Sequence, residues 1–125
     1  MKNILTILIL SLLSAGTMAI TALPWWSYIV LIFIAGAALP LRKWQVNPLL
    51  AGALSGGITW LTLSLLFEAG ASASTIGTVA AIFDVSYITM LLIIAGVAAM
   101  TNGLALFAGY ALRNGKEKLE LKIEA

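Results

Sequence analysis

The sequence predicts an all-α membrane protein, built as a bundle of four transmembrane helices with a short outer amphipathic helix. The chain has 125 residues, of which 62% are hydrophobic and only 10% are charged, and its mean hydropathy is +1.07. An ordinary soluble domain has roughly 25% charged residues, and one of this size cannot bury so much apolar surface. The few charges also divide the chain into long uncharged runs, which are the candidate spans.

The first uncharged run, residues 3–41, is long enough for two crossings. A membrane helix needs about 20 residues, because each residue adds about 1.5 Å to a path of about 30 Å. Pro24 offers a turn in the middle, since proline disfavours helix at the residue before it and suits the first turn of the next helix. We therefore expect spans at about 3–23 and 25–41.

The third span is expected at about 48–67, inside the next uncharged run. It follows Asn47-Pro48, a pair typical of a helix start, because asparagine caps free amides and proline is favoured in the first turn. Glu68 marks the end of this span at the water boundary.

A short amphipathic helix is expected at about 74–84, on the outer surface of the membrane. Its apolar residues Ile76, Val79, Ala80 and Phe83 follow one another at the spacing i, i+3, i+4, i+7 of a helix face. The segment is too short to cross the bilayer, which favours a helix lying on the surface. The alternative is that this segment extends the helix that follows it.

The fourth span is expected at about 85–112, where an uncharged run ends at Arg113. Asn114-Gly115 then predicts a helix stop. Residues 114–125 form a charged cytoplasmic tail in which apolar residues alternate with lysine and glutamate, a pattern typical of a strand. A lone strand is unstable in water, so we expect a disordered tail or one that adds to a partner's sheet edge. Its lysines are expected to attract anionic lipid, but Glu117, Glu120 and Glu124 offset this attraction.

The charges also predict how the four-span domain, residues 1–113, is oriented. All seven basic residues of the chain fall on one side in this arrangement, and the other side carries only Glu68 and Asp84. Loops rich in lysine and arginine stay in the cytoplasm. Both termini and the 42–47 loop are therefore expected there.

Three tryptophans are expected to anchor the bundle at the two membrane–water interfaces. Trp25 and Trp26 would lie at the outer interface and Trp44 at the inner one. Tryptophan is enriched at both interfaces because its ring is apolar and its N–H is polar. These positions agree with the orientation that the charges predict.

The first predicted helix has an alternative interpretation as a cleaved signal peptide. Lys2 precedes an apolar run, and Thr17 and Ala19 fit positions −3 and −1 of a cleavage site. However, the apolar run continues through Ile20 and Leu23, and cleavage would remove packing partners from a small bundle. A retained first helix is therefore favoured.

The composition excludes several kinds of functional site. The chain has no cysteine and no histidine, which excludes disulfides, thiol nucleophiles, Cys/His zinc sites and histidine acid–base chemistry. No phosphate-binding glycine loop is present, and a net charge of +2 is no sign of nucleic-acid binding.

Glu68 and Asp84 could serve as a carboxylate pair, but two carboxylates are too few for a cation cage, and we interpret them as span ends. We expect no enzymatic activity, no cofactor, no metal and no nucleic-acid partner.

Four residues are expected to pack helices closely together: Gly52, Gly56, Asn102 and Gly103. The two glycines of the third span form a GxxxG motif, and small residues let helix backbones approach so that dispersion contacts accumulate. Asn102 is the most prominent polar residue of the fourth span, and such a residue usually forms a hydrogen bond across a helix interface. The partner helix can belong to the same chain or to another.

Three features of the chain are shared with a known group of proteins. These are the Leu-Pro-Trp-Trp motif at 23–26, the outer segment at 74–83, and a last helix rich in glycine and alanine that ends near Arg113. In these features the chain resembles small four-span membrane proteins of Bacteroidota, over residues 1–113. That group has no assigned activity, so the resemblance implies only a location in the bacterial inner membrane.

The sequence therefore predicts a non-enzymatic integral membrane protein that acts as a structural, assembly or interaction subunit. Its expected partners are the lipid bilayer and either another membrane protein or a second copy of the chain. The alternative is a passive channel or carrier for a small uncharged or lipid-like solute. That function requires an oligomer, because four short helices leave little room for a lumen.

Overall fold

The computed structural model describes residues 1–20, 22, 24 and 26–124 of the chain. These residues form six helices and no strand. The prediction of an all-helical chain is therefore confirmed. The helices are α1 (Lys2–Ala19), α2 (Ser27–Ala38), α3 (Leu41–Trp44), α4 (Pro48–Gly70), α5 (Thr75–Ile82) and α6 (Tyr87–Glu124).

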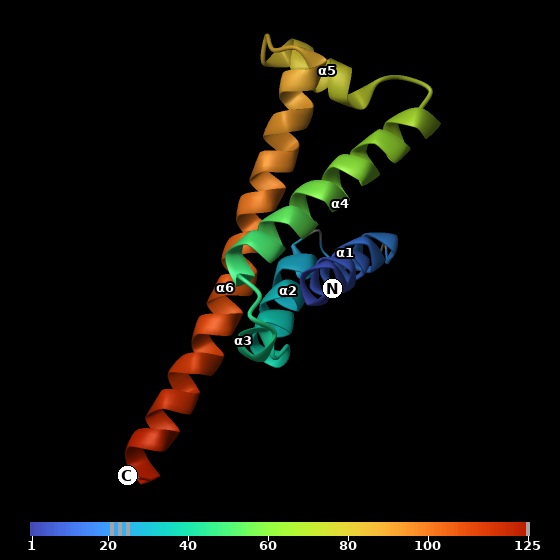
Figure 1. Cartoon of the computed structure of the whole chain (residues 1–125). Helices are drawn as coiled ribbons and strands as arrows, with labels where there is room; N and C mark the ends of the chain where they lie inside the picture. Colours follow the sequence, from blue (N-terminus) through green and yellow to red (C-terminus); the bar gives the residue numbers. More distant parts are fainter. Residues whose placement is uncertain (21, 23, 25, 125) are drawn as a thin grey trace.

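Helices α4 and α6 form the frame of the molecule. They pack closely near the start of α4 and diverge toward α5, which bridges their far ends (Figure 1). Helix α2 packs on α6 farther toward the C-terminus, and α1 packs on α2 and α4 while running across the direction of α6. The core lies where these four helices meet, around the fully buried Leu10, Ile32 and Leu106.

Two helices, α4 and α6, are long and apolar enough to cross a membrane. Their 23 and 38 residues correspond to about 35 Å and about 57 Å of helix. Helices α1 and α2 are shorter apolar helices, and the 12 residues of α2 cover only about 18 Å. The helix lengths support two crossings, and the four-span arrangement stays a prediction.

The first two predicted spans are longer than the helices at these places. Helix α1 ends at Ala19 instead of 23, and Ile20 is already extended. Helix α2 begins at Ser27 instead of 25, because Pro24 belongs to the turn before the helix. Its carbonyl oxygen accepts a hydrogen bond from the Ser27 amide at 3.0 Å.

The end of α2 and the helix α3 also differ from the prediction. Helix α2 stops three residues early because Leu39 precedes Pro40 and is extended. The chain then forms α3, a single turn that the sequence pattern does not indicate. It closes in a Schellman motif, in which Gln45 has a φ of 55° and the Val46 amide bonds to the Leu41 carbonyl at 3.1 Å.

Helix α4 begins where the sequence predicts and ends three residues later. The Asn47 Oδ1 atom accepts hydrogen bonds from the amides of Leu49 at 3.0 Å and Leu50 at 3.3 Å, and proline occupies the first turn. The helix continues to Gly70 because Glu68 does not stop it. Its side chain reaches forward to α5 instead.

Helix α5 is separate from α6, as predicted, and is not an extension of it. A second Schellman motif breaks the two helices: Asp84 has a φ of 54°, and the Val85 amide bonds to the Ala80 carbonyl at 3.0 Å. Ala80 packs against Met90 of α6. Phe83, which the sequence places on the same apolar face, is 68% exposed.

Helix α6 continues to Glu124, well beyond its predicted end near 112. The prediction that Asn114-Gly115 stops the helix is wrong, and so is the expectation of a disordered or strand-like tail. No glycine among the described residues has a positive φ, so Gly115 keeps a helical backbone. Lysine, glutamate and leucine are strong helix formers, and Lys116 and Glu120 form an i,i+4 ion pair at 3.9 Å.

Replacing Gly115 with alanine is expected to stabilise the tail of α6. Apart from the local helix backbone, no atom lies within 4 Å of the position that a Cβ would take there, and alanine is favoured over glycine in a helix by about 0.5–1 kcal/mol. Hydrogen exchange of the tail amides, compared between wild type and variant in the same detergent, measures the effect. Slower exchange is expected, whereas unchanged exchange would show that the tail is not helical in solution.

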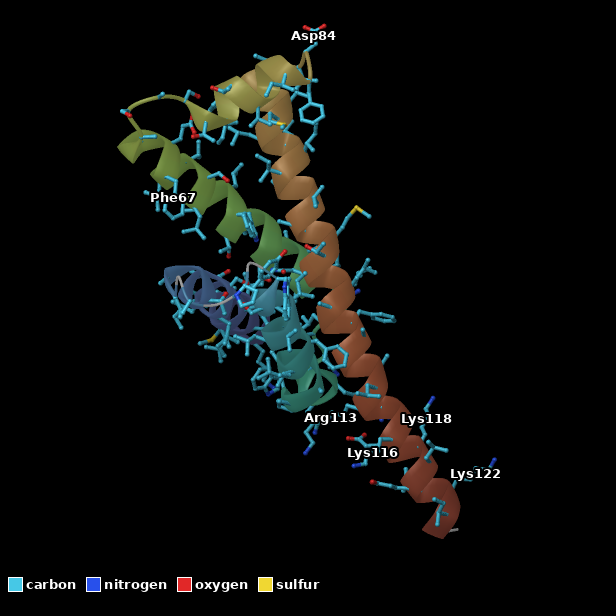
Figure 2. All side chains as sticks on the ribbon, turned by 180° about the vertical axis from the view of Figure 1, so that it is seen from behind. Phe67, Asp84, Arg113, Lys116, Lys118 and Lys122 are labelled. Carbon is cyan, nitrogen blue, oxygen red and sulfur yellow. The ribbon has the colours of Figure 1, made fainter. Side chains whose placement is uncertain are left out.

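Apart from Lys2 beside the N-terminus, the charged side chains lie toward two ends of the molecule. Asp84 lies at the α5 end, and four basic residues of α6 lie on the opposite half of the molecule (Figure 2): Arg113, Lys116, Lys118 and Lys122. We call the region around Arg42, Lys43 and Arg113 the basic end. The N-terminus lies at the middle height of the molecule in Figure 1, so the structure does not bring both termini to this end.

Candidate functional site

Gly52, Gly56 and Gly103 lie where α4 crosses α6, and the two backbones touch there. A Cβ on Gly52 would lie 2.6 Å from the carbonyl oxygen of Asn102, and a Cβ on Gly56 would lie 2.5 Å from that of Ala98. A Cβ on Gly103 would lie 3.0 Å from a carbonyl oxygen of α4. Since Cβ atoms essentially never approach closer than 3.0 Å, the first two positions accept only glycine. The helix that the GxxxG motif contacts belongs to the same chain.

A second close contact joins α2 to α6 and is not among the residues that the sequence singles out. A Cβ on Gly36 would lie 2.3 Å from the Leu106 carbonyl oxygen, and a Cβ on Gly109 would lie 2.0 Å from that of Phe33. The signal that could have revealed it is the spacing of four between Ala105 and Gly109. Helix α6 therefore contacts two helices through their backbones, one after the other.

Asn102 lies fully buried at the α4–α6 crossing and reaches α1. Its Nδ2 atom donates a hydrogen bond to the Ser14 hydroxyl at 3.5 Å. Its Oδ1 atom and the hydroxyl of Thr59 on α4 have no partner among the described residues. An unpaired buried polar group costs roughly 1–3 kcal/mol. Both atoms have almost no accessible surface, so a ligand reaches neither of them in this structure.

A cavity of about 230 Å³ lies between α1 and α4. Thr59 lines it together with Ser11 and Thr62, and the rest of the wall is apolar. The Thr59 hydroxyl is itself buried, so Ser11 and Thr62 are the lining residues whose hydroxyls could hold the polar group of an uncharged solute.

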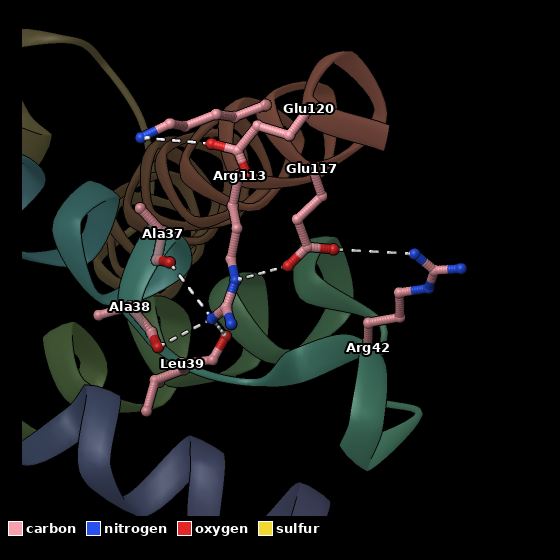
Figure 3. Close-up of polar contacts among 8 residues, drawn as sticks. Ala37, Ala38, Leu39, Arg42, Arg113, Glu117 and Glu120 are labelled. Atoms are coloured by element: carbon pink, nitrogen blue, oxygen red, sulfur yellow. Dashed lines mark hydrogen bonds and ion pairs between the residues drawn. The ribbon is translucent and has the colours of Figure 1, made fainter. Parts of the chain in front are cut away.

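Arg113 closes the C-terminal end of α2, although more than 70 residues separate them in sequence. Its Nη1 atom donates hydrogen bonds to the carbonyl oxygens of Ala37 at 3.4 Å, Ala38 at 3.0 Å and Leu39 at 3.1 Å (Figure 3). The last turn of a helix leaves its carbonyls without partners, and a cation there also matches the helix dipole. Arg113 therefore stabilises the end of a different helix from its own.

Glu117 links Arg113 to Arg42 at the basic end. Its carboxylate accepts from the Arg113 Nε atom at 3.4 Å and lies 3.9 Å from the Arg42 Nη1 atom. With Lys43, these side chains border a cavity of about 350 Å³. From the sequence, Arg113 is expected only to end a span, because a contact across more than 70 residues leaves no local pattern.

The structure does not bring Glu68 and Asp84 into a shared site. Glu68 caps the start of α5, where its oxygens accept hydrogen bonds from the Ser74 hydroxyl and, at 3.3 Å, from the Ile76 amide. Asp84 follows the other end of α5, and eight helical residues, or about 12 Å, separate the two ends. In the part of the chain that the structure describes, no three acidic residues are grouped as a metal site requires.

The tryptophans predicted as interface anchors occupy different environments. Trp25 lies outside the described residues. Trp26 precedes α2 and is 50% exposed, and the nearby Tyr28 packs edge to face on Trp60 with ring centroids 5.7 Å apart. The Tyr28–Trp60 contact places the first turn of α2 beside the middle of α4. Trp44 is partly buried against the core and lies in α3, at the basic end.

Comparison with known proteins assigns the chain to no family. No protein-family model, curated protein or solved structure matches it. The resemblance to the Bacteroidota group therefore stays a prediction. The function is inferred from the chain's own contacts.

Proposed function

We propose that the chain is a multi-pass protein of a bacterial inner membrane and acts there as a non-enzymatic assembly or interaction subunit. In this arrangement α4 and α6 cross the bilayer, and α1 and α2 are embedded beside them. The basic end lies in the cytoplasm, because arginine and lysine are concentrated there. The location is the one that the sequence resemblance implies.

The arrangement retains α1 in the mature protein. Thr6, Leu10 and Ser14 of this helix are at most 2% exposed, and the Ser14 hydroxyl accepts a hydrogen bond from the Asn102 side chain. Removing α1 would take this hydrogen bond from a buried amide, at a cost of roughly 1–3 kcal/mol. These contacts favour a retained helix over a cleaved signal peptide.

The apolar surface near α5 is the observation that carries the subunit role. Beyond the glycine crossing α4 and α6 diverge (Figure 1), and only 28% and 33% of their membrane-length segments are buried within the chain. A partner helix placed between the diverging halves would contact both of them. The large apolar side chains exposed on these halves include Leu61, Leu65, Leu66 and Phe67 on α4 and Ile88, Leu92 and Ile93 on α6.

The hydroxyl residues beside the α1–α4 cavity favour a second candidate function. An oligomer could serve as a passive channel or carrier for a small uncharged or lipid-like solute, whose polar group would bind Ser11 or Thr62 in that cavity. The 230 Å³ cavity beside Thr59 is large enough for a small molecule. This function does not need a partner protein.

Photo-crosslinking in the native host tests the subunit role. A benzophenone side chain is placed at Leu66 or Leu92, on the diverging halves, and at Leu104 as a control on α6 with similar exposure. We expect the first two positions to crosslink one and the same membrane protein, which also co-purifies stoichiometrically in gentle detergent. The control position is expected to give no such adduct.

Other outcomes separate the two candidate functions. A chain recovered alone as a monomer, with adducts to lipid only, would contradict the subunit role. A chain recovered as a defined homo-oligomer would favour the carrier instead. In that case, solute flux into liposomes that is lost on replacing Asn102 or Thr62 would support it.

A further inference from the structure

The cavity at the basic end carries mostly positive charge. It measures about 350 Å³ and lies between the α2–α3 corner and α6. Three cationic side chains line it, those of Arg42, Lys43 and Arg113, against the single carboxylate of Glu117. The excess positive charge is what an anionic ligand requires.

Arg113 is held in position and still has free donors. Its Nη1 and Nε atoms are engaged by the α2 carbonyls and by Glu117 (Figure 3). Within the described residues, its Nη2 atom has no acceptor. The planar guanidinium fits phosphate oxygens, and one that is already positioned loses little freedom on binding.

Arg42 and Lys43 are available to the same ligand. The Arg42 side chain is 73% exposed, and its ion pair with Glu117 at 3.9 Å is too long for a strong hydrogen bond. Lys43 forms no salt bridge in the part of the chain that the structure covers. Both cations can therefore turn toward an anion in the cavity.

The remaining wall and its position indicate what kind of anion fits. Leu39, Leu41 and Tyr110 make one side of the cavity apolar. The cavity also lies where α6 changes from the apolar run that ends at Leu112 to the charged tail that starts at Arg113. If α6 crosses a bilayer, the lipid phosphates lie at this level. Basic pockets between membrane helices on the cytoplasmic side bind lipid headgroups.

We propose that the cavity at the basic end binds the phosphate group of an anionic membrane phospholipid. The phosphate lies against Nη2 of Arg113, Arg42 and Lys43 close on it from the water side, and the glycerol and first acyl carbons lie on the leucines. This proposal rests on α6 crossing the bilayer but not on the subunit role. A chain without any protein partner would still bind the lipid.

Native mass spectrometry of the full chain in detergent tests the proposal. The probes are phosphatidylglycerol and phosphatidylcholine with identical acyl chains. The double variant Arg42→Gln/Lys43→Gln removes two cavity charges, and Lys118→Gln/Lys122→Gln removes two charges from the tail as a matched control.

We expect wild type to prefer phosphatidylglycerol. The cavity variant should bind it about 10- to 30-fold more weakly, since each basic residue near an anionic headgroup contributes about 1 kcal/mol. The tail variant should stay within about twofold of wild type.

A second arm distinguishes a lipid headgroup from free phosphate. If excess inorganic phosphate displaces phosphatidylglycerol, the cavity recognises the phosphate group alone. If it does not, the cavity recognises the lipid as a whole. Three results would overturn the proposal: equal binding of both lipids, unchanged binding in the cavity variant, or an equal loss in the tail variant. An equal loss in the tail variant would show that positive charge anywhere near the bilayer is enough. Lys43→Gln alone serves as the probe if the double variant does not fold.

Discussion

Replacing Gly56 with alanine is expected to destabilise the bundle by about 2–3 kcal/mol. The new Cβ would lie 2.5 Å from the Ala98 carbonyl oxygen and 2.8 Å from the Asn102 Cβ. A backbone carbonyl in the middle of α6 cannot move aside without shifting the whole helix, and overpacking of this kind costs about 1–3 kcal/mol. Leucine at this position would prevent the crossing of α4 and α6 altogether. Unfolding in mixed micelles by titration with SDS, followed by circular dichroism, measures the loss.

The neighbouring residue provides a matched control for this experiment. A Cβ on Gly57 would meet the Ala95 carbonyl oxygen and the Ala99 Cβ at 3.6 Å, which is ordinary van der Waals contact. Gly57→Ala is therefore expected to leave stability unchanged or to raise it slightly, because alanine favours helix. Equal stability of the two variants would show that α4 and α6 do not cross at Gly56.

Replacing Arg113 with glutamine is expected to loosen the C-terminal turn of α2 and to cost about 1.5–2 kcal/mol. The variant loses the charge-assisted hydrogen bonds to Ala37, Ala38 and Leu39. Hydrogen bonds to charged groups contribute about 1.5–3 kcal/mol, and we expect the lower part of this range because the side chain is 35% exposed. Hydrogen exchange of the last α2 amides should accelerate, together with a lower unfolding midpoint in SDS.

Lys116→Gln is the control for the loss of one positive charge on the same helix. The Lys116 side chain is 79% exposed, and its ion pair with Glu120 spans 3.9 Å. Exposed pairs of this kind contribute about 0–1 kcal/mol, so α2 should exchange as in wild type. If both variants accelerated the exchange of α2 equally, the effect would come from net charge and not from the cap on α2.

Sequence-based prediction succeeded where a helix start depends on residues next to it. Asn47-Pro48 starts α4 because one side chain caps two amides within three residues. Ser74 starts α5 in the same way, by accepting a hydrogen bond from the Gly77 amide at 2.9 Å. Such contacts need no information from the rest of the chain, so the sequence alone can indicate them.

Prediction of helix ends was less reliable, because the same residues can stop a helix or continue it. Asn114-Gly115 would stop α6 only if the glycine turned into the left-handed conformation. Asp84 adopts that conformation with a φ of 54°, although aspartate is a weaker stop signal than glycine. Whether the helix ends at such a position depends on what the next residue packs against. Val85 after Asp84 packs against the α5–α6 cluster.

The sequence was enough to predict that the chain is helical and where two of its helices start, and it indicated Gly52 and Gly56 as packing residues of α4. These properties depend on composition and on residues at most four positions apart, and such short spacings repeat regularly along a helix. The folded structure was needed to show that Arg113 caps α2 and that Asn102 reaches α1. These contacts join residues far apart in the chain, and such pairs leave no periodic pattern in the sequence.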